Sequence, residues 1–375
     1  MTKFLVSMLV LVACVLAPQT ALAESPTNDR ATQDEADFFT RTIRVNCDHG
    51  GTLNRALKAF GPRLTIEFKG TCTEDLVIRR DDVTLRGSDA NATLIGGIQI
   101  DGSSRVAISD FLVKDNTQLE GAIEALAGSS VAIHDMVVEN SGNRGIRIRD
   151  SVADIRDVSI DGSATAGLLT RGSNISLEGN ITVTNSAEGG IILTDASSTF
   201  SKEGVIVAND NLFGIIVQTS SSFEGVFGSV TADNNQVHGL LVASNGAFNY
   251  GVTLQTNGNG FAGIYVDEGS IMSPFANLTS LASTTAIGNG FAGIFVDRNS
   301  TFELFGNASI AGQVYGVFIS TASVLQMTDT TLAGNFVGDL RFDFGSVGDF
   351  SNGGNSVGSV SCTADIITRG DVACP

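Results

Sequence analysis

A glycine followed by an apolar–variable–apolar triplet recurs along most of the chain. Clear copies, such as "GIRI" and "GIYV", begin at Gly97, Gly145, Gly167, Gly190, Gly214, Gly239, Gly263, Gly293 and Gly316, and weaker copies begin at Gly121 and Gly338. The spacing between successive glycines is nearly constant, apart from one longer interval between Gly263 and Gly293, and a short fixed period is typical of repeat architectures. Because side chains alternate between the two faces of a strand, each copy predicts a short β-strand with one buried face.

Further alternating segments, such as "SVAIHDMVVEN" and "SVADIRDVSIDG", lie between the glycine motifs. The period is shorter than the roughly 30 residues of a strand–helix–strand unit, and it fits three short strands with three turns. Leucine-rich repeats have a similar period, but their leucine-spaced signature is missing. Coils of this kind stack and bury one continuous apolar core. The pattern therefore predicts an all-β fold, a single-stranded parallel β-helix of about 10–11 coils.

Asparagines form a second series, five residues before a motif glycine, at Asn116, Asn140, Asn185, Asn209 and Asn234. Asparagine tolerates left-handed backbone and can bond its neighbour along a stack, so these residues predict an asparagine ladder. With both series, residues 43–361 resemble the right-handed parallel β-helix, or pectate-lyase-like, superfamily. The resemblance implies a right-handed coil and, in sugar-active members, a site on an outward sheet face beside loops that leave the coil.

Both ends of the β-helix are expected to carry caps, because an open coil presents unpaired strand edges. Residues 50–60, "GGTLNRALKAF", have apolar side chains at helical spacing and predict an amphipathic helix over the N-terminal end of the core, similar to the caps of many β-helix proteins. The apolar positions are Leu53, Ala56, Leu57 and Phe60. The N-terminal cap is assigned to residues 42–72 of a domain that covers residues 42–375.

The four cysteines that follow residue 23 form two local pairs, one at each end of the domain. In an oxidising compartment the expected disulfides are Cys47–Cys72 and Cys362–Cys374. The second bridge closes a C-terminal disulfide cap over residues 362–375. There is no Cys-x-x-Cys pair of the kind that binds a metal ion.

The first 23 residues predict a secretory signal peptide. Lys3 precedes the apolar run "FLVSMLVLVACVLA", and an Ala-x-Ala pattern at Ala21 and Ala23 places cleavage before Glu24. The segment "LVAC" also fits a lipoprotein cleavage box, with a lipid anchor on Cys14. Residues 24–41 are polar and acidic and predict a flexible leader. The protein is therefore expected to be secreted, extracellular or periplasmic, with no other segment able to span a membrane.

The net charge of −18 argues against nucleic acid or anionic membranes as partners, and it favours divalent cations or basic partners. The three histidines, His49, His134 and His238, have no metal-type spacing. No cofactor is therefore required, and calcium is the candidate ion.

The outward position of each motif strand, read down the stack, forms one row of side chains. From N- to C-terminus the row is Gln99, Ile123, Arg147, Leu169, Ile192, Ile216, Leu241, Tyr265, Phe295, Phe318 and Leu340. Its members from Leu169 to Phe318 form an apolar stripe, which would be an interaction surface if exposed. Tyr265, Phe295 and Phe318 could stack on sugar rings, or a protein partner could dock there. The alternative is that loops, such as the long 268–288 insertion, cover the stripe.

Asp267 and Asp297 occupy the same place in successive coils, two residues after Tyr265 and Phe295. Stacked coils are about 4.8 Å apart, so the two carboxylates could act as an acid/base pair or as Ca²⁺ ligands. The alternative is that each aspartate begins the turn after its strand and that Arg298 neutralises the pair.

Arg147, Arg149 and Arg171 form a basic spot on an acidic protein. Arginine binds carboxylates through bidentate hydrogen bonds, so the spot predicts a site for an anionic glycan. The resemblance adds a second interpretation, because an arginine can serve as the base in lyases of this superfamily. The alternative is that these arginines pair with Asp150, Asp154 and Asp157.

Three functions remain open from the sequence. The first is an exported surface protein that binds a polysaccharide or cell-surface glycan. The second is a polysaccharide lyase, C5-epimerase or glycoside hydrolase acting on an acidic glycan, and the third is an adhesion scaffold that docks protein through the apolar stripe. The chain lacks the Arg-x-Pro-x-x-Arg phrase of pectate lyases, the Asn-Thr-Asp, Gly-His-Gly and Arg-Ile-Lys phrases of polygalacturonases and the Asp-Pro-His phrase of alginate epimerases.

Overall fold

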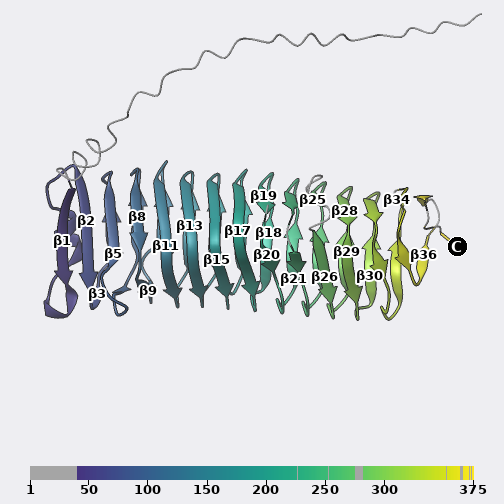
Figure 1. Ribbon diagram of the computed structural model, residues 1–375, viewed down its shortest axis with the longest axis horizontal. Coiled ribbons are helices and arrows are strands. Elements are labelled where there is room, and N and C mark those ends of the chain that lie inside the picture. The colour runs from purple at the N-terminus through teal and green to yellow at the C-terminus, as the bar shows by residue number, and fades with distance from the viewer. Residues whose placement is uncertain are drawn as a thin grey trace, which may run out of the picture. The chain divides into compact units, whose positions relative to one another are not determined.

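The glycine-marked segments are β-strands in the computed structural model of the chain (Figure 1). The structure describes residues 40–375, apart from residues 226, 252, 275–281, 352, 364–365, 371 and 373. The expected signal peptide and the expected leader, except for its last two residues, lie outside the described residues. All strand pairings within the described part are parallel, which confirms the all-β parallel β-helix.

The glycine motifs lie in one parallel sheet of thirteen strands, called the motif sheet, and each motif strand pairs with its successor as expected. β4 and β36 extend this sheet at its ends without a motif glycine, so it has more strands than the 10–11 coils predicted. The strands are β4 (Leu76–Ile78), β7 (Ile98–Asp101), β10 (Gly121–Leu126), β12 (Arg144–Arg149), β14 (Leu168–Arg171), β16 (Gly189–Thr194), β18 (Phe213–Val217), β21 (His238–Val242), β24 (Ala262–Val266), β27 (Ala292–Val296), β30 (Tyr315–Ile319), β33 (Gly338–Phe342) and β36 (Val360–Cys362).

The remaining strands of the coils form a sheet of 24 strands, called the second sheet. They are β1 (Thr40–Asn46), β2 (Arg63–Lys69), β3 (Thr71–Thr73), β5 (Val83–Gly87), β6 (Thr93–Ile95), β8 (Val106–Ser109), β9 (Leu112–Lys114), β11 (Ser130–Glu139), β13 (Val152–Asp161), β15 (Asn174–Thr184), β17 (Ser198–Asn209), β19 (Ser222–Gly225), β20 (Ser229–Thr231), β22 (Ala247–Tyr250), β23 (Thr253–Gln255), β25 (Ile271–Pro274), β26 (Ser283–Ile287), β28 (Thr301–Phe305), β29 (Asn307–Ala311), β31 (Val324–Thr328), β32 (Thr331–Leu332), β34 (Val347–Phe350), β35 (Ser356–Val357) and β37 (Ile367–Gly370). No helix in the described residues has the length and apolar character needed to cross a membrane.

Inward side chains of both sheets fill the interior of the coils. Ile264, Val266, Ile294 and Val296, from two nearly identical motifs, are fully buried, as predicted. Their strands pair in register, with Ile264 beside Ile294. Each such side chain contributes about 1.5–3 kcal/mol by leaving water, so the repeated motif supplies core at every coil.

The two weaker motif copies are shifted by one residue relative to the prediction. Ile123 pairs with Ile98 and is fully buried, and Leu340 is also fully buried, although both were expected to point outward. Glu124 and Arg341 hold the outward positions instead. The period of a strand is two residues, so a slip of one residue moves every side chain to the opposite face. An alanine and an aspartate take the place of the motif glycine in these two coils.

An asparagine ladder is present, but it is built mainly from residues other than those predicted. The backbone amide of each member donates to the side-chain oxygen of the next, over 2.9–3.0 Å, and the members are Asn211, Asn235, Asn259 and Asn289. Asn140, Asn185 and Asn234, from the predicted series, have φ of 49°, 55° and 57°. They occupy the left-handed turn itself, whereas the ladder residues follow it and are buried.

A serine ladder follows the other end of the motif strands. Each serine amide donates to the next serine hydroxyl over 3.1–3.3 Å. The members are Ser103, Ser129, Ser151, Ser173, Ser197 and Ser221, and all are buried. The side chains of the two ladders accept hydrogen bonds from buried backbone amides in the turns, which have no partner within the sheets. An unpaired buried amide costs about 1–3 kcal/mol.

A short helix, α2 (Leu53–Leu57), covers the N-terminal end of the core and follows the 3-10 helix η1 (Cys47–His49). Leu53 and Ala56 are buried as predicted. Phe60, predicted on the same helical face, is 92% exposed. A helix is disfavoured before proline, and "GP" follows Phe60 directly. The helix therefore ends early, and Phe60 lies beyond the turns that reach the core.

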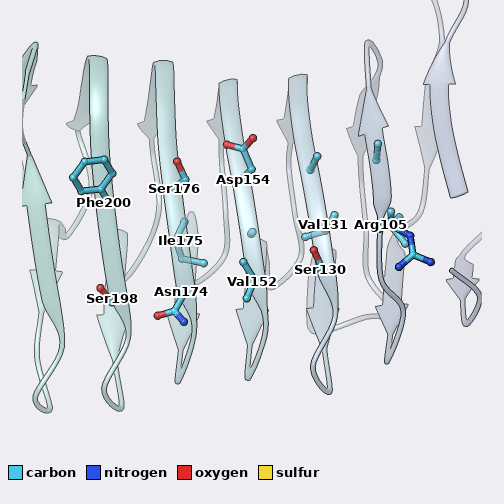
Figure 2. A pocket seen from close by; sticks show the side chains of 14 residues that line it. Arg105, Ser130, Val131, Val152, Asp154, Asn174, Ile175, Ser176, Ser198 and Phe200 are labelled. Carbon is cyan, nitrogen blue, oxygen red and sulfur yellow. The ribbon is translucent and has the colours of Figure 1, made fainter. Parts of the chain in front are cut away.

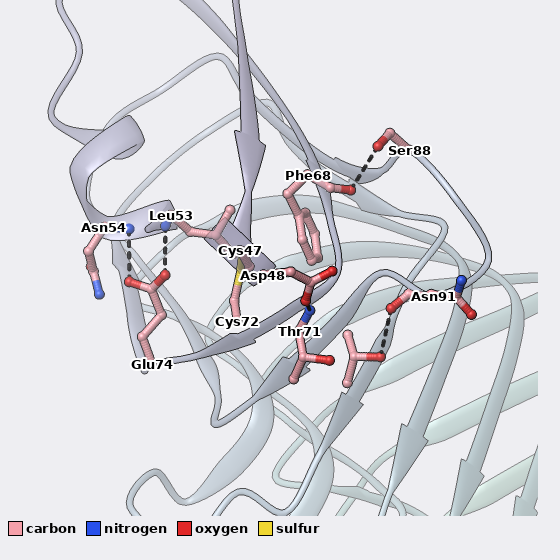
Figure 3. The surroundings of a disulfide bond; sticks show 11 residues. Cys47, Asp48, Leu53, Asn54, Phe68, Thr71, Cys72, Glu74, Ser88 and Asn91 are labelled. Atoms are coloured by element: carbon pink, nitrogen blue, oxygen red, sulfur yellow. Dashed lines mark hydrogen bonds between the residues drawn. A yellow bond between two sulfur atoms is a disulfide. The ribbon is translucent and has the colours of Figure 1, made fainter. Parts of the chain in front are cut away.

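Both predicted disulfides are present. Cys47–Cys72 joins η1 to β3 with its Cα atoms 5.1 Å apart (Figure 3). Cys362–Cys374 joins β36 to the end of the chain with its Cα atoms 5.8 Å apart. Each bond ties an end of the stack to a neighbouring segment, and such bonds restrict the unfolded chain.

Glu74 caps α2, and its removal is expected to weaken the N-terminal cap. The amides of Leu53 and Asn54 donate to Glu74 Oε1 and Oε2 over 2.6 and 3.0 Å (Figure 3). Glu74→Gln keeps one acceptor oxygen and loses the charge, so stability should fall by about 1 kcal/mol in urea denaturation. The exposed Glu203→Gln is the control and should stay within about 0.5 kcal/mol. Equal losses in both variants would contradict the capping role.

Candidate functional site

The predicted ligand residues Tyr265, Phe295 and Phe318 form one ring stack on the outward face of the motif sheet. The centroids of Tyr265 and Phe295 are 4.8 Å apart, with 9° between the ring planes. Those of Phe295 and Phe318 are 5.0 Å apart, with 8° between the planes. The spacing equals the distance between paired strands, because the same position of successive coils carries each ring. Phe295 therefore has a ring against each face, and neither face is free for a sugar.

More rings and one cation complete this aromatic surface. Phe261 and Phe291 stack at 4.9 Å with 16° between their planes, and Phe291 meets Phe318 edge-on at 5.7 Å. The guanidinium of Arg341 lies 5.6 Å from the Phe318 centroid and ends the stack. These contacts stabilise the outward face of the coils beyond simple burial.

In the N-terminal part of the apolar stripe, neighbouring side chains of the stripe shield one another from solvent. Ile192 and Ile216 are 5% and 7% exposed, and Leu169 and Leu241 pack against them. The predicted cover by the 268–288 insertion falls partly on residues 275–281, which lie outside the described residues. The strands that flank these residues, β25 and β26, belong to the second sheet rather than to the sheet of the stripe.

Asp267 and Asp297 both begin turns, and Arg298 neutralises Asp267. Asp267 Oδ1 accepts from the Glu268 amide, and Asp297 Oδ1 accepts from the Arg298 amide, each over 2.8 Å. The Arg298 guanidinium donates to both oxygens of Asp267, with Nε 2.6 Å from Oδ1. Asp267 is buried and both its oxygens are engaged. Across the described residues, no group of three or more acidic, histidine or cysteine side chains could hold a metal ion.

The titratable rings beside Asp267 are held neutral. Burial and the Asp267 carboxylate raise the pKa of Tyr265. The His238 ring lies 5.0 Å from the Tyr265 ring, and burial lowers the pKa of His238 to about 4. At neutral pH the phenol is therefore protonated and the imidazole uncharged, so Tyr265 is a poor general base in this state.

The predicted basic spot is a network of ion pairs on the motif sheet. Arg147 contacts Glu120 and lies 3.5 Å from Glu124 Oε1. Glu124 is buried, and burial raises its pKa against the opposing effect of Arg147. The partners were not those expected, because the outward position of the preceding coil holds Glu124 once the register is corrected.

The other two arginines of the spot are also beside carboxylates. Arg171 pairs with Asp195, and Arg149 Nε is 3.8 Å from Asp150 Oδ2. Asp150 was among the predicted partners and Asp195 was not. Surface pairs of this kind contribute little stability, but they place a carboxylate beside each cation that an anionic glycan would need.

A groove that the sequence analysis did not identify crosses the second sheet (Figure 2). It runs over β8, β11, β13, β15 and β17 and has a volume of about 670 Å³. Register places equivalent outward side chains of these strands in two rows. One row is Ser130, Val152, Asn174 and Ser198, and the other is Ala107, Ala132, Asp154, Ser176 and Phe200.

Most side chains of the groove are small, and its ends are marked by larger ones. Phe200 and Arg105 lie at opposite ends (Figure 2). Arg105 forms a bidentate ion pair with Asp82, with Nε–Oδ1 and Nη2–Oδ2 distances of 2.7 and 2.8 Å. This pair lowers the pKa of Asp82. Within the groove, Asp154 Oδ2 is 3.3 Å from His134 Nε2.

Comparisons with known proteins agree with this architecture. A family model described as "Right handed beta helix region" matches residues 96–277. The A-module of Azotobacter vinelandii mannuronan C-5 epimerase AlgE6 is similar in structure, with 14% identity and a TM-score of 0.54 over 88% of this chain and 100% of that one. The chain therefore has the right-handed parallel β-helix fold of pectate-lyase-like proteins.

Other solved structures match at lower TM-scores. The A-module of Azotobacter vinelandii mannuronan C-5 epimerase AlgE4 has 13% identity and a TM-score of 0.46, over 95% of this chain and 96% of that one. A variant of the periplasmic alginate epimerase AlgG has 14% identity and a TM-score of 0.46, over 88% of this chain and 84% of that one. No curated protein sequence matches the chain.

Proposed function

We propose that this protein binds a polysaccharide along the groove of the second sheet and does so outside the cytoplasm. The observation that carries the proposal is the pair of side-chain rows in Figure 2, held in register across five strands. Four strand spacings of about 4.8 Å make the row from Ala107 to Phe200 roughly 19 Å long, and three spacings make the row from Ser130 to Ser198 roughly 14 Å long. These lengths suit a short stretch of an extended sugar chain.

The groove offers both kinds of contact that a sugar needs. Ser130, Asn174 and Ser198 are exposed and carry hydroxyl or amide groups that can bond sugar hydroxyls. Phe200 is 41% exposed and Val152 is 52% exposed, and they can pack on the apolar face of a sugar ring. The floor is a rigid sheet, so binding would cost little ordering of the protein.

Binding is favoured over catalysis at this groove. Among its lining residues, Asp154 is the one carboxylate, whereas glycoside hydrolysis generally uses two. On the motif sheet, Arg298 engages both carboxylate oxygens of Asp267, so the predicted acid/base pair of Asp267 and Asp297 has little support. The similar AlgE6 module is a mannuronan C-5 epimerase, and this fold-level analogy makes polysaccharide the first ligand class to test.

Export is the other part of the proposal. The two disulfides, Cys47–Cys72 and Cys362–Cys374, are of the kind that persists in oxidising compartments. The N-terminal sequence has the charged, apolar and Ala-x-Ala regions of a signal peptide. Cell fractionation with N-terminal sequencing of the mature protein tests it, and an uncleaved protein retained in the cytoplasm would contradict it.

Phe200→Ala should weaken polysaccharide binding about tenfold or more, because the loss of one stacked ring is worth about 1.4 kcal/mol. Titration calorimetry against a panel of neutral and acidic polysaccharides measures the effect. Phe336→Ala is the matched control, since Phe336 is 80% exposed in a distant coil and its loss should leave affinity unchanged. Equal affinity of Phe200→Ala and the unaltered protein would disprove the site, and no binding to any polysaccharide of the panel would disprove the function.

A further inference from the structure

The groove offers an incoming anion no unpaired cation among its lining residues. Arg105 is their one arginine or lysine, and Asp82 holds its guanidinium through two hydrogen bonds. A carboxylate is best recognised by an arginine whose two parallel N–H groups are free. To bind an acidic sugar in this way, Arg105 would have to leave Asp82 unpaired.

Two further cations on the strands of the groove also lie beside carboxylates. Lys202 Nζ lies 3.4 Å from Glu178, and Arg156 Nε lies 3.8 Å from Asp157. Both cations therefore have a carboxylate beside them. Asp154 faces His134, which carries a positive charge only when it is protonated.

Asp154 also places a negative charge in the groove itself (Figure 2). A polymer with one carboxylate on each sugar would bring charges of the same sign against it, and such juxtaposition lowers affinity. The net charge of −18 adds repulsion at longer range, which salt screens over about 8 Å at physiological ionic strength. The exposed hydroxyl, amide and apolar side chains of the groove do not require a charged ligand.

We propose that the groove selects an uncharged polysaccharide and discriminates against one that carries a carboxylate on each sugar. The inference rests on the proposed function and names its ligand class. The proposed ligand of the groove therefore differs in charge from the anionic glycan that the sequence predicts for the basic spot around Arg147.

The test uses two pairs of polymers that share a backbone and differ in charge. One pair is fully methyl-esterified polygalacturonan and its acid form, and the other is a soluble β-glucan and the same glucan with its C6 hydroxyls oxidised to carboxylates. In low salt the uncharged member of a pair should bind at least about tenfold more tightly. Added salt should narrow the gap, because it screens the repulsion.

Asp154→Asn isolates the local charge. It should reduce the preference for the uncharged polymer several-fold by strengthening binding of the charged one. Asp329→Asn removes the same charge from an exposed turn in a distant coil, and it should leave the preference as it was. An equal change in both variants would show that net charge, and not Asp154, causes the discrimination.

The outcomes separate the two proposals. If a carboxylated polymer binds as tightly as its uncharged partner, and Phe200→Ala weakens it, the groove is a glycan site but the charge selection is wrong. If no polymer of either pair or of the wider panel binds in a Phe200-dependent manner, both proposals fail. A Phe200-dependent preference for the uncharged member supports both.

Discussion

Replacing Asn259 with alanine should lower the stability of the protein by about 2 kcal/mol or more, because each buried donor left without an acceptor carries a desolvation penalty. Asn259 Oδ1 accepts from the backbone amide and from Nδ2 of Asn235 over 2.9 and 3.1 Å. Its own Nδ2 donates to Asn289 Oδ1 over 3.0 Å. All three residues are buried. Alanine leaves two donors of Asn235 without an acceptor, and each unpaired buried group costs roughly 1–3 kcal/mol.

Urea denaturation measures the global effect, and amide hydrogen exchange at Asn235 measures the local one. The control is Asn307→Ala, because Asn307 is an exposed strand residue and its loss should stay within about 0.5 kcal/mol. If Asn259→Ala is no worse than this control, the ladder is not a source of stability.

Lowering the pH from about 6.5 to about 4 should cost the protein about 3 kcal/mol through His238 alone. Burial among aromatic rings lowers the pKa of His238 from 6.5 to about 4 in the folded state. Between these values the unfolded chain binds a proton that the folded protein does not, so stability rises with pH in this window. Each pKa unit corresponds to about 1.4 kcal/mol, which sets the size of the effect.

His238→Phe should flatten the pH dependence of unfolding between about pH 4 and 6.5, because phenylalanine fits the ring contacts and does not titrate. Denaturation curves at several pH values for both proteins give the difference directly. The control is His49→Gln at the exposed end of η1, which tests whether the loss of any histidine flattens the curve. A slope that survives in His238→Phe would mean that other groups cause it.

The first effect arises from one property of the fold, the repetition of a side chain at the same place in successive coils. Repetition is favourable when the side chain bonds or stacks with its copy, as Asn259 does with Asn289 and Phe295 does with Phe318. It is unfavourable for like charges, and the structure places Arg298 against Asp267. We therefore expect a ligand site where the outward side chains have no partner among the described residues of the next coil, as at the exposed Phe200 in the groove.

The sequence was sufficient for several features that depend on spacing along the chain. The glycine period predicted the parallel stacking, and alternation within each motif predicted core positions such as Ile264 and Val296. The two cysteine pairs were predicted correctly because the members of each are close in sequence and lie at one end. The expected role of Arg298 beside Asp267 also came from neighbouring positions in adjacent coils.

The tertiary structure decided which side chains of different coils meet. The weaker motifs slipped by one residue, so Glu124 rather than Ile123 faces Arg147, and the ladder includes Asn259 instead of the residues in the turns. No sequence pattern indicates the groove, because small residues such as Ser130 line it only once the strands of five coils lie side by side. Alternation within a strand is local and can be read from the chain, whereas register between coils depends on the length and path of every intervening turn.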